Sequence, residues 1–317
     1  QAELQDLYPT VKDLAVKGSE NPNLLPKGAI TVRMHSVGGW GAITTGKNLA
    51  ITLYDLLGYD IKANPKYGSE KKGQPTTYYL SAAPEPIRIN CEYFFVDAVL
   101  SPDPNVFSHS NPLFGLKKGG TFIIQSELAS SDEVWRSIPE WARNHIVKQE
   151  IRMFYLDAFK IAREEASDPE LQFRMQGIAF QGAFFAGSTL METAGFTEES
   201  LFKAIHGQVE KKFGSKGARV VEDNMRVVRR GFDQITEITE KETTDSGTRE
   251  ARMETNLPIM LKRMPASEDP KTDIHRFWEQ TGSFYAGGHP NDNLADPFNA
   301  LAVMPANTGV YRDMTKI

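Results

Sequence analysis

The chain is 317 residues long, 40% of them are hydrophobic, and its formal net charge at pH 7 is −5. This length and hydrophobic content suffice for a large buried core, in about two domains or in one domain with an extension. Lysine and arginine are scattered through an acidic chain rather than massed, which argues against a nucleic-acid-binding protein.

The cysteine and histidine content limits the metal chemistry of the chain. The single cysteine, Cys91, lies in an apolar run, and we expect it to be a small core residue. One cysteine cannot build a disulfide framework, a thiolate zinc site or a self-contained iron–sulfur cluster. The six histidines include no pair at i, i+4 spacing, so we expect no histidine metal site.

Export and membrane insertion have no support in the sequence. There is no run of about 18 apolar residues, and the first residues carry no signal-peptide pattern. We therefore expect a cytoplasmic location and no membrane contact.

The first half of the chain reads as a peripheral arm followed by strands. Residues 1–28 are expected to form the arm, with one short helix at 4–16. A glycine-rich loop separates the first strand from a helix that Gly58 ends. The predicted elements of this half are, in order, a strand at 30–37, a helix at 45–57, a strand at 59–63, a polar loop at 64–75, strands at 76–81 and 91–100, a turn at 117–120, and strands at 121–125 and 150–155.

The second half is predicted to be helical. Thr197 gives a capping signal for the third of its helices, and the second is apolar all round, which is typical of a helix buried between layers. The predicted helices are 157–165, one contained within 170–194, 199–213 and 216–238. Strands that alternate with helices predict an α/β fold, a layered Rossmann-like sheet with flanking helices, over residues 29–239. Residues 240–317 lack periodic apolar content and are expected to form an extended arm that wraps a partner.

The glycine-rich loop, SVGGWGAITTGKNLA at 36–50, invites comparison with two nucleotide-binding motifs. The dinucleotide fingerprint G-x-G-x-x-G fails because Thr44 stands in place of the third glycine. The P-loop G-x-x-x-x-G-K-[ST] is nearly met by Gly41, Gly46 and Lys47, but Asn48 replaces the hydroxyl residue that binds magnesium. A Walker-B-like run, FFVD, ends at Asp97. A P-loop NTPase is therefore one alternative.

Four motifs occur in a fixed order along the chain. They are the glycine loop GGWGAITTGKNLA, the segment NPKYGSEKKGQPTTYYLS with the PEPIR that follows it, the strand FFVDAVL, and LFGLKKGGTFIIQS. Together they resemble the γ subunit, or γ-type domain, of the pyruvate and 2-oxoacid:ferredoxin oxidoreductases over residues 31–238. Two positions depart from the family pattern, since Trp40 replaces a more usual polar residue and Gln74 replaces a glycine.

The resemblance implies a subunit of a hetero-oligomeric oxidoreductase. Such enzymes decarboxylate a 2-oxoacid reversibly by thiamine diphosphate chemistry and pass low-potential electrons to ferredoxin. In the family, thiamine diphosphate, magnesium and the [4Fe–4S] clusters lie on the alpha, beta and ferredoxin-like subunits, and this chain has neither cluster cysteines nor a GDG-plus-Asn pattern. The γ-type chain is thus expected to supply no catalytic residue, to pack against these partners, and to border the cleft where coenzyme A enters. A pure scaffold subunit is a further alternative.

Two short segments supply the candidate cofactor-binding residues that this resemblance implies. Adjacent lysines on a glycine-bounded loop could meet the phosphates of coenzyme A as mobile point charges, or they could form a solvated charge run. The glycine loop could form a nest for an anion, or a tight turn against a neighbouring subunit. The candidates are Lys71, Lys72, Gly38, Gly39, Gly41 and Thr44.

Two further polar residues are expected to be structural. His35 lies at the end of the first strand, beside the glycines, and has no carboxylate partner in the sequence, so we expect a hydrogen-bonded structural histidine. Asp97 is expected near the end of a buried strand, where a structural role is favoured over a catalytic one.

Overall fold

A computed structural model describes residues 24–66, 73–89, 91–167 and 172–242, together with six isolated positions between 268 and 283. The helix predicted at 4–16 lies outside the described residues, as does most of the arm predicted over 240–317. The predicted domain boundaries at 28 and 239 stay predictions. None of the described helices combines the length and the apolar character that crossing a bilayer requires.

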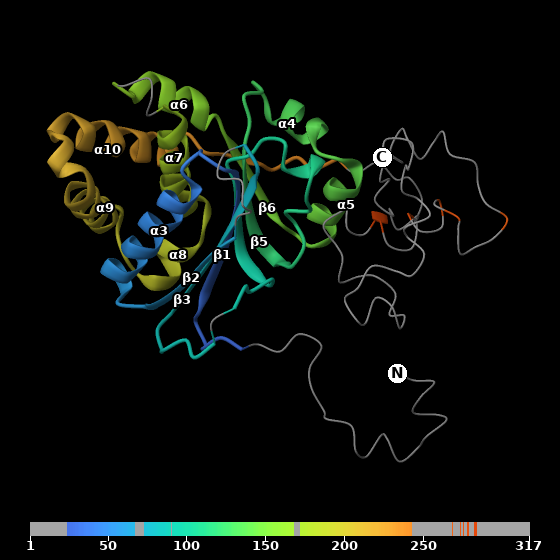
Figure 1. Cartoon of the computed structure of the whole chain (residues 1–317), viewed down its shortest axis with the longest axis horizontal. Helices are drawn as coiled ribbons and strands as arrows, with labels where there is room; N and C mark the ends of the chain where they lie inside the picture. Colours follow the sequence, from blue (N-terminus) through green and yellow to red (C-terminus); the bar gives the residue numbers. More distant parts are fainter. Residues whose placement is uncertain are drawn as a thin grey trace, which may run out of the picture.

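The strands of the described residues form one mixed sheet of seven. They are β1 (Ile30–Val37), β2 (Asp60–Lys66), β3 (Pro75–Ala83), β4 (Val96–Ser101), β5 (Leu116–Gln125), β6 (Arg152–Leu156) and β7 (Thr236–Ile238). Their order across the sheet is β2-β3-β1-β4-β5-β6-β7 (Figure 1). Strands β1, β4, β5 and β6 run parallel, whereas β3 is antiparallel to both β1 and β2, and β7 is antiparallel to β6. The α/β prediction is therefore confirmed.

Helices cover both faces of this sheet (Figure 1). They are α3 (Ala42–Leu57), α4 (Ser131–Ser137), α5 (Glu140–Lys148), α6 (Ala158–Glu165), α7 (Gln172–Gly187), α8 (Leu190–Ala194), α9 (Glu198–Phe213) and α10 (Ala218–Asp233), with 3₁₀ turns η1 (Val106–Ser108) and η3 (Gly214–Lys216). One hydrophobic core joins the sheet to α3, α6, α7, α9 and α10. A second core joins the other face to η1, α4 and α5.

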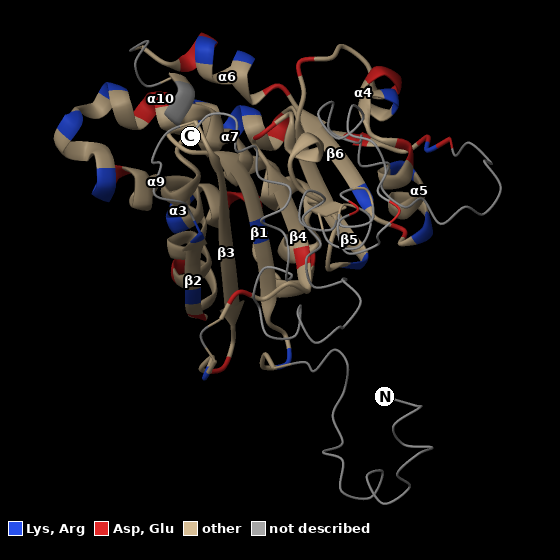
Figure 2. Cartoon of the chain, turned by 45° about the vertical axis from the view of Figure 1, so that its right-hand side comes forward, with Lys and Arg blue, Asp and Glu red and all other residues tan. Residues whose placement is uncertain are grey.

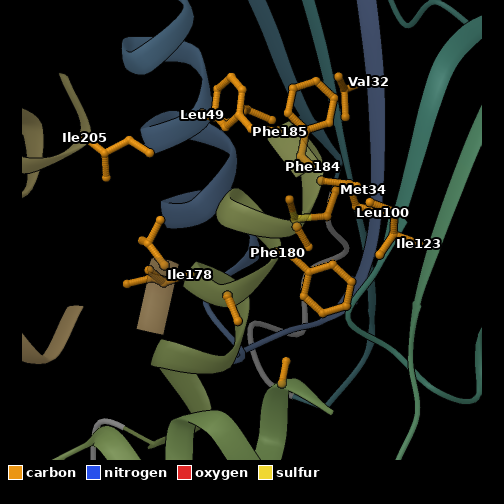
Figure 3. Packing of buried hydrophobic residues seen from close by; sticks show 14 of the residues in the cluster. Val32, Met34, Leu49, Leu100, Ile123, Ile178, Phe180, Phe184, Phe185 and Ile205 are labelled. Atoms are coloured by element: carbon orange, nitrogen blue, oxygen red, sulfur yellow. The ribbon is translucent and has the colours of Figure 1, made fainter. Parts of the chain in front are cut away.

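The first core contains the side chains on one face of the sheet, because successive residues of a strand point to opposite faces. Val32 and Met34 of β1 point to the face that carries α3 and α7, where they meet Leu49 and Phe184 (Figure 3). Each of these side chains is at most 2% exposed. Burying an aliphatic or aromatic side chain of this size contributes about 1.5–3 kcal/mol, so α3 and α7 are fixed firmly on the sheet.

Helix α7 is buried on opposite sides, by the sheet and by α10. A methyl group added at Gly182 would lie 2.0 Å from the carbonyl oxygen of Val228, and one added at Gly231 would lie 2.0 Å from that of Ala179. Both glycines therefore allow the backbones of α7 and α10 to touch. The prediction of an apolar helix between layers is confirmed for α7, although it ends at Gly187 and α8 follows as a separate helix.

The strand predicted at 91–100 begins only at Val96. In the segment before it, the Phe94 carbonyl accepts a hydrogen bond from the buried guanidinium of Arg33 of β1 at 3.3 Å instead of joining a strand ladder. Phe94 and Phe95 are exposed, and Cys91 is only half-buried, so its placement as a core residue is wrong. Arg33 also donates to the carbonyls of Pro112 and Phe114, which ties down the segment before β5.

The other differences have local causes. The residues of the turn predicted at 117–120 belong to β5 instead, because this strand already begins at Leu116. The helix predicted at 216–238 ends at Asp233, because Thr236 and Ile238 pair with β6 instead. Helices α4 and α5 were not predicted. For α4 the available signal is the Ser130 N-cap, whose hydroxyl accepts a hydrogen bond from the N–H of Glu133 at 3.3 Å.

Candidate functional site

The glycine loop forms a tight turn between β1 and α3. Gly39 and Gly41 have φ angles of 98° and 85°, in the left-handed region that residues with a Cβ rarely adopt. The Trp40 N–H closes the turn by donating to the Val37 carbonyl at 3.0 Å. The turn itself therefore requires glycine at both positions.

A pair of backbone hydrogen bonds joins this turn to the segment that follows the lysines. The Gly38 N–H donates to the Gln74 carbonyl at 2.8 Å, and the Gly73 N–H donates to the Gly38 carbonyl at 2.9 Å. Lys71 and Lys72 lie outside the described residues, and they directly precede Gly73 in the sequence. The structure thus brings the end of the lysine segment, Gly73 and Gln74, to the glycine turn.

Helix α3 begins at this turn with its first N–H groups free of a side-chain cap. Gly41 is the N-cap and has no side chain to offer, and the first turn contains no acidic residue. The first intrahelical hydrogen bond runs from the Thr45 N–H to the Gly41 carbonyl at 2.9 Å. The preceding N–H groups, including that of Thr44, thus have no partner within the helix, and together with the helix dipole they can hold an anion.

The position of the turn in the sheet is also typical of a ligand site. Parallel strands β1 and β4 are neighbours. The chain leaves β1 for α3 on one face of the sheet and leaves β4 for η1 on the other face. Such a switch in direction opens a crevice at the carboxyl ends of the strands, and α/β sheets commonly bind ligands there.

On the β4 side of this edge lies a carboxylate–imidazole pair that sequence reasoning missed. Nε2 of His109 is 2.6 Å from Oδ2 of Asp103, and Asp103 is buried. The Asp103 carboxylate also accepts from the N–H of Asn105 at 2.9 Å, which fixes its orientation. The available signal was the run DPNVFSH, in which an aspartate begins a turn that returns a histidine to it.

His35 stands beside this pair and is neutral at physiological pH. Burial, with smaller contributions from the nearby charges of Arg33 and His109, holds the pKa of His35 well below its usual range. Its Nε2 atom is buried and has no hydrogen-bond partner among the described residues. The expectation that its hydrogen bonds are satisfied is therefore wrong for Nε2.

Asp97 has the predicted structural role at an unpredicted place. It is the second residue of β4 rather than near its end, so it lies at the amino edge of the parallel strands, opposite the glycine turn. Its carboxylate accepts from the N–H and the hydroxyl of Thr31, both at 2.8 Å, and pairs with Nζ of Lys117 at 2.7 Å. These contacts tie together β1, β4 and β5.

The structure rules out the P-loop alternative. Residues that would form the phosphate loop between Gly41 and Gly46 are already helical, because α3 begins at Ala42. A methyl group added at Gly46 would lie 2.4 Å from the ring of Tyr78, so this glycine allows the helix to pack on the sheet. Asp97 stands at the wrong end of its strand for a Walker-B carboxylate. Within the described part of the chain, no three His, Cys, Asp or Glu side chains are grouped to hold a metal ion.

Comparisons with known proteins agree on one family. A family model described as pyruvate ferredoxin/flavodoxin oxidoreductase matches residues 31–234. The pyruvate/ketoisovalerate oxidoreductases common subunit gamma of Thermococcus litoralis is 27% identical over 194 residues, which cover 61% of this chain and 94% of that relative. The pyruvate:ferredoxin oxidoreductase of Moorella thermoacetica is 24% identical over 219 residues, 69% of this chain but 18% of that much longer protein.

A solved structure shows the same fold. The pyruvate oxidoreductase subunit PORC from Thermotoga maritima matches with a TM-score of 0.50 at 20% sequence identity, over 68% of this chain and 100% of that one. The family match ends at residue 234 and leaves the C-terminal region outside it.

Proposed function

The chain belongs to the pyruvate ferredoxin/flavodoxin oxidoreductase family, and from that membership we propose that it works as the γ-type subunit of a complex that oxidatively decarboxylates a 2-oxoacid and reduces ferredoxin. The relatives that it matches over nearly their whole length are gamma subunits, which supports this assignment. We propose alpha, beta and ferredoxin-like subunits as its partners. The single cysteine supports a reducing compartment, and the cytoplasm is the proposed location.

The redox cofactors belong on the partner subunits in this proposal. Thiamine diphosphate with magnesium supplies the carbanion chemistry at the keto carbon, and [4Fe–4S] clusters carry the electrons. The residues of this chain do not fit a [4Fe–4S] cluster, because the cluster takes four cysteine ligands and the sequence contains only Cys91. In this proposal the chain supplies binding and positioning and no catalytic residue.

The ligand contact that we propose for this chain is with the phosphates of coenzyme A at the glycine turn. The observation that carries it is the backbone pairing of Gly38 with Gly73 and Gln74, which joins the lysine segment to an uncapped helix N-terminus. In this proposal the N–H groups of the turn and of Thr44 bind phosphate oxygens, and Lys71 and Lys72 neutralise the remaining charge.

The test is the double substitution Lys71→Ala and Lys72→Ala in the assembled complex. Each lost charged hydrogen bond costs up to about 1.5–3 kcal/mol, so the KM for coenzyme A should rise by at least about tenfold, while the KM for the 2-oxoacid stays constant. Lys117 and Lys118 provide a control, since they are also adjacent lysines directly before a glycine but lie at the amino edge of the sheet. An unchanged KM for coenzyme A would overturn the phosphate contact.

The assignment to a complex has its own test. Affinity purification of the chain from its native source, followed by iron and thiamine assays on the co-eluting subunits, should find both cofactors in the complex. A chain that elutes without partners, iron or thiamine would contradict the proposed function.

A further inference from the structure

An open groove runs between α3 and α9, on the outer side of the helical layer. Its volume is about 1250 Å³, and it is lined by both helices and by the turn before α9. Ile51 and Tyr54 of α3 are 44% and 60% exposed on its wall, and Phe196 also lines it. Gly207 lies in the α9 wall, where an added methyl group would meet nothing within 4 Å. Exposed large apolar side chains gathered in one hollow are typical of an interaction site.

The charges around the groove are almost all positive. Lys47 of α3 and Lys203, Lys211 and Lys212 of α9 line it, against one carboxylate, Asp55. Figure 2 shows these basic segments in blue on both helices. Nζ of Lys212 donates to the Asn48 side chain at 2.7 Å, whereas the other three lysines have no ion pair among the described residues. Burial, with the nearby charge of Lys47, lowers the pKa of Lys212.

A buried amide joins the two helices that form the groove. Gln208 of α9 is 5% exposed and lines the groove. Its Oε1 atom accepts a hydrogen bond from the hydroxyl of Thr52 of α3 at 3.1 Å. This bond helps to hold α3 and α9 side by side, so the groove is a fixed feature of the helical layer.

The size and the chemistry of the groove together indicate its occupant. Small-molecule pockets measure about 300–1,000 Å³ and are largely enclosed, whereas this groove is larger and lies open between two helices. Apolar side chains on the walls and lysines around them match a helix that has one apolar face and carboxylates beside it. Because the groove presents four lysines against one carboxylate, charge complementarity selects an acidic occupant.

We infer that the α3–α9 groove receives an acidic amphipathic helix from a partner subunit of the complex. This inference rests on the proposed function, since it needs partner subunits. It also assigns a place to Lys47, which lies in the second turn of α3 and belongs to this groove rather than to a phosphate loop.

The experiment measures the affinity of the purified full chain for the remaining subunits of its complex, at low and high salt. Gly207→Leu fills the open wall, and the pair Lys203→Glu and Lys211→Glu reverses two charges. We expect each change to weaken binding by at least about tenfold, and the effect of charge reversal to shrink as salt screens it. Gly207→Ala and the pair Lys148→Glu and Lys160→Glu, on exposed positions of α5 and α6, are the matched controls and should bind as the wild type does.

A photo-crosslinker at Tyr54 in the assembled wild-type complex gives a readout that does not depend on how well the variants fold. It should capture a partner-subunit helix rich in Asp and Glu. Capture of a second copy of this chain, capture of a segment without acidic residues, or wild-type affinity in both groove variants would overturn the inference. If the wild-type chain does not bind the subunits at all, the proposed function itself fails.

Discussion

Gly231 on α10 is a position where one added methyl group should have a large effect on stability. The added Cβ of Gly231→Ala would stand 2.0 Å from the carbonyl oxygen of Ala179 and 2.7 Å from its carbonyl carbon. Both atoms belong to the backbone of α7, so no side-chain rotation can relieve the clash. The two helices have to move apart by about 1.5 Å to restore an ordinary van der Waals contact.

The size of the effect follows from two opposing terms. Replacing glycine by alanine inside a helix stabilises it by about 1 kcal/mol, whereas forcing extra volume into a close-packed interface costs about 1–3 kcal/mol, and more when backbone must shift. Because the obstacle at Gly231 is backbone, we expect a net loss of about 2 kcal/mol. Gly207→Ala, on the helix α9 of the same length, meets nothing within 4 Å and should gain about 1 kcal/mol.

Urea unfolding of the purified chain, followed by circular dichroism, measures both variants against the wild type. The free energies of unfolding of Gly231→Ala and Gly207→Ala should differ by about 3 kcal/mol. If Gly231→Ala is as stable as Gly207→Ala, the close contact between α7 and α10 does not exist, and the packing argument fails.

Two further predictions concern polar residues near opposite ends of the parallel strands, His35 and Asp97. Because the folded chain holds His35 neutral while the unfolded chain protonates it, the unfolded state binds the extra proton, and stability should fall below about pH 6.5 by up to about 1.4 kcal/mol per pH unit. His35→Gln should flatten this slope in urea unfolding between pH 7.5 and 5.5, and an unchanged slope would show that another group causes it. Asp97→Asn should cost about 1–2 kcal/mol through its lost pairing with Lys117 and weaker bonds to Thr31, yet leave the kcat of the assembled complex unchanged. A loss of kcat in a fully folded Asp97→Asn complex would contradict its structural role.

The parts of the fold that sequence reasoning recovered are those set by local pattern. The strand at Ile30–Val37 and the helix that ends at Gly58 follow from β-branched residues, helical apolar spacing and a glycine stop. Thr197 caps α9 as predicted, through a hydrogen bond from the Ser200 N–H at 3.3 Å. Errors arose where a distant partner overrides local preference, as when Arg33 draws the chain at Phe94 out of the strand register.

For the candidate site, too, the sequence determined some features and the tertiary structure decided others. Composition and motif order determined the family, the lack of cysteine ligands for an iron–sulfur cluster, and the glycine turn as the candidate binding site. These properties depend only on residue identity and spacing. Tertiary structure alone decided that Gly38 pairs with Gly73, and that Lys47 belongs to a groove with residues of α9 more than 150 positions away. These contacts join segments far apart in the chain, and no local propensity encodes such a distance; only the packing of the helices on the sheet brings them together.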